Sequence, residues 1–303
     1  MLCVGLKTVK KEITILIISI LEMLLIISCS NSSSNNNEGN NSTGGKDSQQ
    51  VITYFGVKPP TVAKQVGDIV FNDGSATPYE TGLQLSNEQE NAAIAIIFYK
   101  GINCSNNNEI RTLGIGLKQY KNSENLIAWC STDANAYNVD ISSIHCRVTE
   151  ENENYLFSGD KDGSDNFYQI SSFLSNNDDT TIEKNYPLFY FAKNYNLTAN
   201  NLGENYNTGW YIPSIAELYE IYNSRNIIND VASLCNRFSS VRNGLYWSST
   251  QYDSSLFSND SFLQDSKNKW AYFISTISNV DKRINKDFKE NITGLYACVI
   301  HAF

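Results

Sequence analysis

Residues 209–218 read GWYIPSIAEL, and this stretch carries the strongest local structural signal in the chain. Ser214 and Glu217 form an S-x-x-E capping box, in which each side chain accepts a hydrogen bond from a backbone N–H that the first helical turn leaves unpaired. Apolar residues at positions 215, 218, 219 and 222 then make one stripe at helical spacing. We therefore predict a helix that begins at Pro213 and Ser214.

Short bursts of aromatic and β-branched residues extend on both sides of this helix, separated by turns rich in Asn, Asp, Gly and Ser. Such bursts predict short strands, although strand and buried helix are hard to separate at residues 94–99. The predicted strands are 67–71, 94–99, 112–117, 126–130, 245–247, 270–274 and 295–300, and the shorter predicted helices are 87–95, 164–174 and one near Pro187. Because helices and strands do not alternate regularly, we expect one α+β domain over residues 51–303, with long loops.

The N-terminus resembles a bacterial lipoprotein signal. Lysines at positions 7, 10 and 11 precede an apolar stretch, residues 13–27, that leads into Cys29. This stretch of about fifteen residues is shorter than the roughly 20 that a spanning helix needs, and Glu22 inside it would be costly in a bilayer. We expect residues 1–28 to be a cleaved signal peptide and Cys29 to carry acyl chains in the lipid bilayer. An uncleaved anchor helix and a buried helix are the alternatives.

Residues 29–50 are predicted to form a lipidated, disordered tether. Positions 30–50 contain no aliphatic or aromatic side chain, so they bury too little apolar surface to offset their conformational entropy. A flexible chain of this length reaches about 25 Å, which would hold the domain clear of the lipid headgroups. We therefore expect a protein of the bacterial cell envelope, at the outer membrane or surface rather than the inner membrane.

The charge balance limits the partners of the chain. The formal net charge is −9, and cleavage of residues 1–28, with three lysines and two glutamates, would make it one unit more negative. An acidic surface repels phosphate backbones and anionic glycans, and no basic run marks a nucleic-acid groove. The sequence therefore excludes nucleic acid as an expected partner.

Five of the seven cysteines remain after Cys3, in the predicted signal, and Cys29, at the predicted anchor, are set aside. An exported compartment permits disulfides, but an odd number leaves at least one thiol unpaired within the chain. Cys130 and Cys146 flank a polar loop and are the favoured pair, with two buried thiols as the alternative. A disulfide there would stabilise the fold by roughly 3 kcal/mol on the chain-entropy model.

The order of motifs around the predicted helix resembles a bacterial domain family best known as the C-terminal domain of collagen-like adhesins. The W-x-[LI]-P-[ST]-x-x-E-L signature of that family is similar to residues 210–218, and its Y-W-S-S-[ST] strand is similar to residues 246–250. An aromatic strand around residues 270–272 follows, and the chain ends CVIHAF where the family has a C-x-V-R-x-F-like strand. The residues that carry the resemblance are Trp210, Pro213, Ser214, Glu217, Tyr246, Trp247 and Trp270.

The resemblance is strongest over residues 205–303, and residues 67–71 and 160–165 extend it toward repeated spirochaete lipoproteins that carry this domain. It implies a C-type-lectin-like fold, which formylglycine-generating enzymes share. His301 stands where the family usually has Arg, so any carboxylate pairing made by that Arg would be weaker or pH-dependent here. We expect the signature residues to serve the fold, with Trp210 and Ile212 pointing into the core.

Recognisable catalytic motifs are absent from the sequence. There is no H-E-x-x-H, G-x-S-x-G or P-loop, and nothing marks the reactive cysteine pair of formylglycine-generating enzymes. We therefore expect neither enzymatic activity nor a cofactor. Asp160, Asp162 and Asp165 are a weak calcium candidate, because Ca²⁺ takes six to eight oxygen ligands. A polar turn with a helix N-cap is the simpler interpretation, so we expect no metal site.

Aromatic residues in polar loops supply the remaining functional signal. Tyrosine surrounded by Ser and Asn is typical of recognition surfaces, although packing over the core is the alternative. The candidates for ligand contact are Tyr206, Tyr252, Phe257 and Phe262. Together with the anchor they predict a non-catalytic adhesion or binding module for a host or envelope protein or glycan. A structural envelope lipoprotein without a specific ligand and, less favoured, a formylglycine-generating-type enzyme are the alternatives.

Overall fold

The structure is a computed structural model that describes residues 53–118, 120, 126–151, 154–172, 179–235, 241, 243–253, 268–277 and 282–303. These residues all lie in the compact unit Ile52–Phe303. The predicted signal peptide, Cys29 and the tether lie outside the described residues. In the part of the chain that is described, no helix has the length and apolar character needed to cross a membrane.

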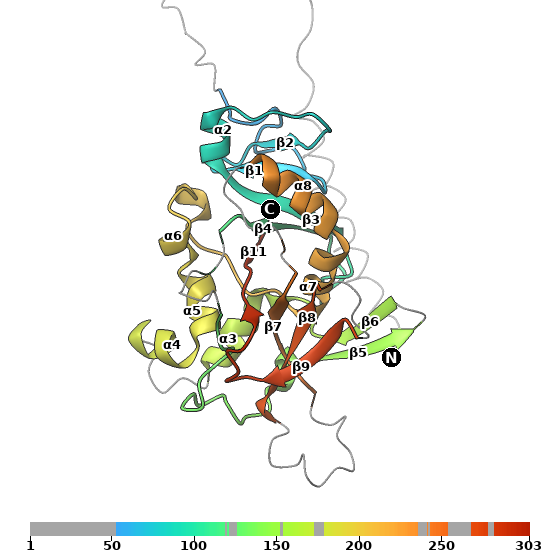
Figure 1. The fold of residues 1–303 in the computed structure, drawn as a ribbon, viewed down its shortest axis with the longest axis vertical. Helices are drawn as coiled ribbons and strands as arrows, with labels where there is room; N and C mark the ends of the chain where they lie inside the picture. Colours follow the sequence, from blue (N-terminus) through green and yellow to red (C-terminus); the bar gives the residue numbers. More distant parts are fainter. Residues whose placement is uncertain are drawn as a thin grey trace, which may run out of the picture. The chain divides into compact units, whose positions relative to one another are not determined.

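The first sheet has five strands in the order β11-β4-β3-β1-β2, and every neighbouring pair is antiparallel (Figure 1). Strand β3 is buried over its first seven residues, and neighbouring positions contribute to different hydrophobic clusters, Ile97 to one and Ile96 to the other. This sheet therefore lies between two parts of the core. Its strands are β1 (Asp68–Phe71), β2 (Ala76–Pro78), β3 (Ala93–Gly101), β4 (Arg111–Gly116) and β11 (Ile300–Ala302).

A second sheet has four strands in the order β10-β7-β8-β9, with β10 parallel to β7 and the other pairs antiparallel. Strands β5 and β6 form a separate hairpin, which Figure 1 places on the side opposite to helices α4 and α5. The strands are β5 (Cys146–Glu151), β6 (Asn154–Gly159), β7 (Leu245–Gln251), β8 (Trp270–Ser275), β9 (Ile284–Phe288) and β10 (Leu295–Tyr296).

The helices are short and cover the two clusters separately. Leu188 and Phe189 of α5 belong to the first cluster, whereas Leu218 of α7 and Val231 of α8 belong to the second. The α-helices are α2 (Asn87–Ala92), α3 (Asn166–Ser171), α4 (Asp179–Asn185), α5 (Pro187–Lys193), α6 (Tyr195–Thr198), α7 (Ile215–Asn223) and α8 (Arg225–Leu234). The 3-10 helices are η1 (Ser142–Ile144), η2 (Gly163–Asp165) and η3 (Glu204–Tyr206).

Helix α7 confirms the capping box. The Ser214 hydroxyl accepts the Glu217 N–H at 3.2 Å, and the Glu217 carboxylate accepts the Ser214 N–H at 2.8 Å. Trp210 and Ile212 lie in the first cluster while Tyr211 between them lies in the second, as alternation along an extended segment requires. The α+β class and the predicted strands near β1, β3, β4, β7 and β8 are confirmed.

Residues 126–130 do not form the predicted strand. Their backbone N–H groups donate at separate points, Ile127 to the Leu295 carbonyl and Cys130 to the Lys289 carbonyl, both at 3.1 Å. The indole N–H of Trp247 donates a hydrogen bond to the Ile127 carbonyl oxygen at 2.8 Å. Because a buried side chain occupies this acceptor, the segment crosses the core as irregular backbone. The predicted helix at 87–95 is also too long, since α2 ends at Ala92 and β3 begins at the next residue.

The predicted disulfide between Cys130 and Cys146 is not formed. Both residues are buried free thiols, and they belong to different hydrophobic clusters, Cys130 to the first and Cys146 to the second. Burial raises the pKa of each thiol to about 12, so both stay protonated and unreactive near neutral pH. The alternative, two buried thiols that fill core space, is the one that the structure has.

Candidate functional site

A cleft of about 610 Å³ opens between helix α3, the end of helix α5 and the segment that precedes helix α7. This volume lies within the range of roughly 300–1,000 Å³ that small-molecule sites occupy. The lining residues are mostly aromatic, hydroxyl or amide in character, and Lys193 is the charged side chain among them. They are Gly163, Ser164, Phe167, Tyr168, Ser171, Phe189, Ala192, Lys193, Asn194, Asn196, Asn207, Thr208, Gly209, Trp210, Tyr211 and Ile212.

Two glycines allow the cleft walls to approach each other. A Cβ at Gly163 would lie 2.6 Å from the Ile212 carbonyl oxygen and 2.6 Å from the Ser214 nitrogen, both backbone atoms that cannot move aside independently. Gly209 has φ +85°, a conformation that L side chains rarely adopt, and a Cβ there would lie 2.9 Å from His301 Nε2. Glycine at these two positions therefore permits close backbone contacts that a side chain would prevent.

Aromatic packing holds the apolar part of the cleft in place. The rings of Phe167 and Phe189 stack with centroids 5.7 Å apart and an interplanar angle of 15°. The Trp210 indole donates to the Tyr206 carbonyl at 2.7 Å, which fixes the orientation of its ring. His301 packs behind Trp210 with ring centroids 5.2 Å apart. These contacts make the aromatic wall largely preformed.

The rim of the cleft is polar and accessible. Tyr168 is 76% exposed, so its ring is available at the edge of the cleft. Asn196 and Asn207 also line it, and each amide offers one acceptor and two donors. Aromatic faces beside amide and hydroxyl groups can bind a ligand that has apolar ring faces and many hydroxyl groups, with little use of charge.

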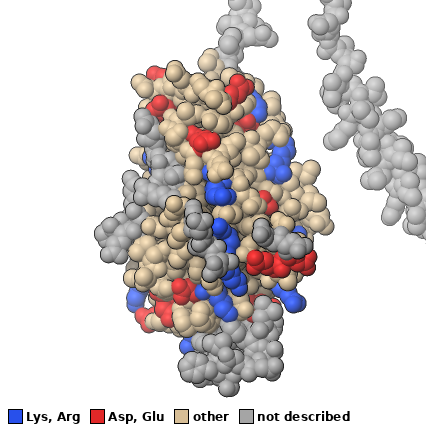
Figure 2. Space-filling model, turned by 45° about the vertical axis from the view of Figure 1, so that its right-hand side comes forward, with Lys and Arg blue, Asp and Glu red and all other residues tan. Residues whose placement is uncertain are grey.

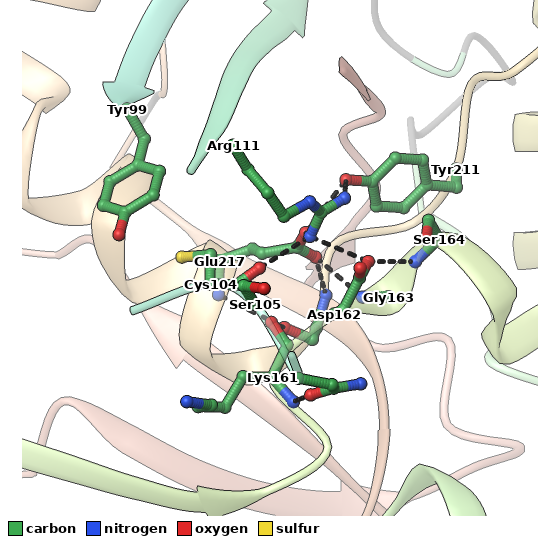
Figure 3. A network of polar contacts seen from close by, with 12 residues as sticks. Tyr99, Cys104, Ser105, Arg111, Lys161, Asp162, Gly163, Ser164, Tyr211 and Glu217 are labelled. Atoms are coloured by element: carbon green, nitrogen blue, oxygen red, sulfur yellow. Dashed lines mark hydrogen bonds and ion pairs between the residues drawn. The ribbon is translucent and has the colours of Figure 1, made fainter. Parts of the chain in front are cut away.

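A buried polar network supports the wall formed by residues 162–164 (Figure 3). One guanidinium nitrogen of Arg111 on strand β4, Nη1, lies 2.7 Å from Glu217 Oε1 and 2.7 Å from Asp162 Oδ1. The other, Nη2, donates to the Tyr211 hydroxyl at 2.7 Å, and that hydroxyl donates to Glu217 Oε1 at 2.9 Å. Gly163 N–H donates to Glu217 Oε2 at 3.0 Å. The network therefore ties the first sheet and helix α7 to the cleft loop.

The Glu217 carboxylate is surrounded by hydrogen-bond donors. Burial raises the pKa of Glu217, whereas the Arg111 charge opposes that shift. Four donors surround the two oxygens: Arg111, Tyr211 and the backbone N–H groups of Gly163 and Ser214. With its lone pairs filled by donors, Glu217 is bonded as a carboxylate. Burial and the Glu217 charge also raise the pKa of Tyr211, so its hydroxyl remains a donor.

The three carboxylates of the weak calcium candidate, Asp160, Asp162 and Asp165, each bond to different partners. Asp162 pairs with Arg111 and accepts the Ser164 N–H at 2.9 Å, so it caps the turn as the simpler interpretation predicted. Asp160 accepts from the Asn106 amide at 2.7 Å, and Asp165 accepts from Gln169 at 3.1 Å. Within the described ranges, no group of three or more His, Cys, Asp or Glu side chains could hold a metal ion.

The predicted ligand-contact residues do not gather in the cleft. Tyr206 packs against His301 and Phe303 behind Trp210, while Tyr252 packs against the buried ring of Tyr272. Phe257 and Phe262 lie outside the described residues. Both described tyrosines are partly buried, which is closer to the alternative of packing over the core.

Among the described residues, His301 forms no ion pair with a carboxylate. Its ring lies among Tyr206, Trp210 and Phe303, and burial lowers its pKa, so the neutral form is favoured. A buried arginine–carboxylate pair is made instead by Arg111, on strand β4 next to β11.

Sequence reasoning missed most of the cleft. The sequence reads FYQIS at residues 167–171 and shows an apolar stripe, but not that Tyr168 lies on its exposed edge. The usable signal was the pair of Gly163 and Gly209, each next to a polar loop. Only the contacts across the fold reveal that these two glycines flank one cavity.

Comparisons with known proteins give one structural likeness to report. No family model matches the chain, and no curated protein matches it. The chain is similar to the crystal structure of a fimbrial protein from Bacteroides ovatus ATCC 8483, with 15% sequence identity and a TM-score of 0.50. The match covers 79% of this chain and 49% of the fimbrial protein, so this chain spans about half of that length. At this identity the likeness concerns the fold alone.

Proposed function

We propose that this protein is a lipid-anchored, surface-displayed binding module without catalytic activity, and that its cleft binds an uncharged glycan of a host or of the envelope. The observation that carries the proposal is the cleft of about 610 Å³, with aromatic walls, an amide rim and Lys193 as its charged lining residue. Sugars present apolar ring faces edged by hydroxyl groups, which this combination of side chains complements.

The sequence supports the location of this module. The signal-like N-terminus ending at Cys29 and the polar segment after it are typical of an exported lipoprotein that is held away from the membrane. Likeness in fold to a fimbrial protein is compatible with display at a bacterial surface. A C-type-lectin-like arrangement of the domain, as the motif order implies, belongs to the same proposal.

A glycan array tests the binding function directly. The probe is the mature chain with Cys29→Ser, which removes the acylation site and keeps the rest of the protein. We expect it to bind a set of neutral oligosaccharides. Binding of acidic glycans alone, or silence across neutral glycans, would overturn the assignment of the cleft and favour a structural envelope role.

A matched pair of variants connects any binding to the cleft. Tyr168 and Leu197 are both exposed, at 76% and 73%, but only Tyr168 lines the cleft. Tyr168→Ala should weaken glycan binding about ten-fold, because an aromatic anchor contributes on the order of 1–2 kcal/mol. Leu197→Ala should leave binding unchanged, and equal losses in both variants would place the ligand elsewhere.

The lipid anchor has its own test. In cells, Cys29→Ser or treatment with globomycin should block processing as a lipoprotein, so that a larger precursor that keeps residues 1–28 accumulates. An unchanged size of the protein under both treatments would contradict processing and lipidation at Cys29.

A further inference from the structure

A second, smaller groove of about 180 Å³ lies between the β5–β6 hairpin, strand β9 and the end of strand β7. At about 30 Å³ per water molecule, it has room for a group the size of a monosaccharide. Three tyrosines, two lysines and an asparagine supply most of its chemistry. The lining residues are Val148, Glu150, Tyr155, Tyr252, Tyr272, Lys282, Ile284, Asn285 and Lys286.

The tyrosine walls of this groove are held by packing against each other and against Tyr219. Tyr252 and Tyr272 lie with ring centroids 5.1 Å apart, and Tyr155 packs edge-on against Tyr219 at 5.3 Å. The Tyr155 hydroxyl accepts the backbone N–H of Arg283 at 3.2 Å, which links the hairpin to the start of strand β9. The aromatic surface is therefore positioned before any ligand arrives.

Cations gather around these rings although the protein as a whole is acidic. Lys286 Nζ lies 3.7 Å from the centroid of the Tyr252 ring. Nearby, the guanidinium groups of Arg225 and Arg283 lie 4.1 Å and 4.4 Å from the Tyr222 centroid. Figure 2, turned toward the hairpin side of Figure 1, shows Lys and Arg side chains in a band with acidic groups beside it. The local charge thus differs from the net charge of −9.

Lysines outnumber carboxylates among the residues that line the groove. Lys282 and Lys286 line it together with one carboxylate, Glu150. Across the described residues, Arg225, Lys282 and Arg283 enter no ion pair. Burial, followed by the Lys282 charge, lowers the pKa of Lys286 to about 8, so an anion beside it would relieve repulsion between the two lysines.

We propose that this groove binds the carboxylate of an acidic sugar residue, with Lys282 and Lys286 as the cationic partners and the tyrosine rings as the surface for the sugar ring. A concave, tyrosine-lined pocket of this size suits one ring and one anionic group. A lipid headgroup would instead need a surface that meets a bilayer over a wide area. This site does not depend on the neutral glycan proposed for the larger cleft.

The test compares sugar acids with their own methyl esters. Methyl β-D-glucuronide, methyl α-D-galacturonide and the methyl glycoside of N-acetylneuraminic acid are titrated into the Cys29→Ser mature chain and followed by calorimetry. We expect at least one acid to bind, and its methyl ester to bind at least ten-fold more weakly, since hydrogen bonds to charged groups contribute more than neutral ones. No binding by any of the three acids, or equal binding of acid and ester, would overturn the proposal.

Variants assign the binding to this groove. Lys282→Gln with Lys286→Gln should reduce affinity for the acid at least ten-fold, whereas Lys286→Arg keeps the charge over Tyr252 and should retain most of it. Lys193→Gln in the larger cleft is the matched control and should leave acid binding unchanged. If Lys193→Gln abolishes acid binding and the double variant does not, the acid occupies the cleft and the groove assignment fails.

Inorganic phosphate and vesicles containing anionic lipid separate the other sources of negative charge. We expect phosphate to compete only weakly, because it offers no ring for the tyrosines. Phosphate binding as tight as that of the sugar acid, or retention on vesicles that depends on Lys282 and Lys286 without any sugar-acid binding, would contradict the proposal. Loss of neutral glycan binding in Tyr168→Ala leaves the groove intact, so failure of one site is distinguishable from failure of the other.

Discussion

The network around Arg111 and the groove around Lys286 place similar chemical groups in opposite situations. Arg111 is buried against two carboxylates, Glu217 and Asp162, and a tyrosine hydroxyl. Lys286 instead lies over the ring face of Tyr252 at a groove that also contains Lys282. In the first region the charges are paired inside the fold, whereas in the second two lysines line a groove that a ligand can enter.

The difference separates structural charge from recognition charge. Removing one member of a buried pair leaves its partner without compensation in a medium where desolvation is costly. Removing a cation from an aromatic ring at the surface loses a modest attraction, because water can solvate what remains. The two regions should therefore respond very differently to the same kind of substitution.

Arg111→Met is expected to have the largest effect. It leaves the fully buried Glu217 carboxylate and the nearby Asp162 without their cation, so the free energy of unfolding should fall by about 3–5 kcal/mol. Urea unfolding followed by circular dichroism measures the change. A loss below 1 kcal/mol would show that the network is solvated and does not hold the cleft loop.

The same variant should depend on pH. Without Arg111, burial raises the folded-state pKa of Glu217 further above its unfolded value, so the folded protein binds the proton more tightly. Stability of Arg111→Met is then greatest below the unfolded pKa and is lost as pH rises through the folded pKa. The deficit relative to wild type should be smaller at pH 5 than at pH 8, and a deficit independent of pH would contradict the assignment to Glu217.

Binding of a sugar acid to the groove should also depend on pH, here because a lysine loses its positive charge as pH rises. Lys286, whose pKa lies near 8, must be protonated to attract the carboxylate, while Tyr252 and Tyr272 stay neutral because burial raises their pKa values. Affinity should be constant from pH 6 to 7 and fall about ten-fold as pH rises past 8 and the lysine loses its charge. Calorimetry measures this, and affinity that is still unchanged at pH 9.5 would exclude Lys286 as the partner.

Arg225→Met is the surface counterpart of Arg111→Met and should have a small effect. Arg225 lies over the Tyr222 ring and donates to the Tyr222 carbonyl at 2.8 Å, so the expected loss is about 1–2 kcal/mol in the same urea experiment. Equal losses for the two arginines would remove the distinction between the regions.

Reducing agent should have no effect at all. Because Cys130 and Cys146 lie in different clusters, dithiothreitol should leave the melting temperature unchanged. Intact mass of the Cys29→Ser mature chain after alkylation under denaturing, non-reducing conditions should show all five remaining thiols modified. A pair protected from alkylation would restore the disulfide that the spacing predicted.

Local signals were readable from the sequence, and contacts across the chain were not. The capping box of Ser214 and Glu217 depends on residues three apart, so it could be predicted. Residues 126–130 have the composition of a strand, but the indole of Trp247, 120 residues away from Ile127, donates a hydrogen bond to the Ile127 carbonyl. The sequence predicted that Glu217 caps the helix, but not that it pairs with Arg111, which lies 106 residues earlier. Cys130 and Cys146 are close in sequence, yet the core separates them.

The candidate sites show the same contrast between local sequence signals and contacts across the chain. Tyr252 was selected for its polar loop and does line a groove, but the lysines beside it come from strand β9 and from the residues just before that strand. Tyr206 had the same composition around it and instead packs behind Trp210. Net charge predicted repulsion of anionic glycans, although local charge around the groove is positive. Composition indicates that a surface recognises ligands, and only the fold shows which tyrosines are available.

The most direct test of the distinction between structural charge and recognition charge is urea unfolding of Lys286→Gln beside wild type. Both are measured with and without the sugar acid that binds in the calorimetry experiment. Without the acid, we predict unfolding free energies within about 1 kcal/mol of each other. With the acid in excess, the wild-type midpoint should move to higher urea, and the variant midpoint should move clearly less. A variant that loses several kcal/mol without ligand, or that is stabilised by the acid as much as wild type, would contradict the account.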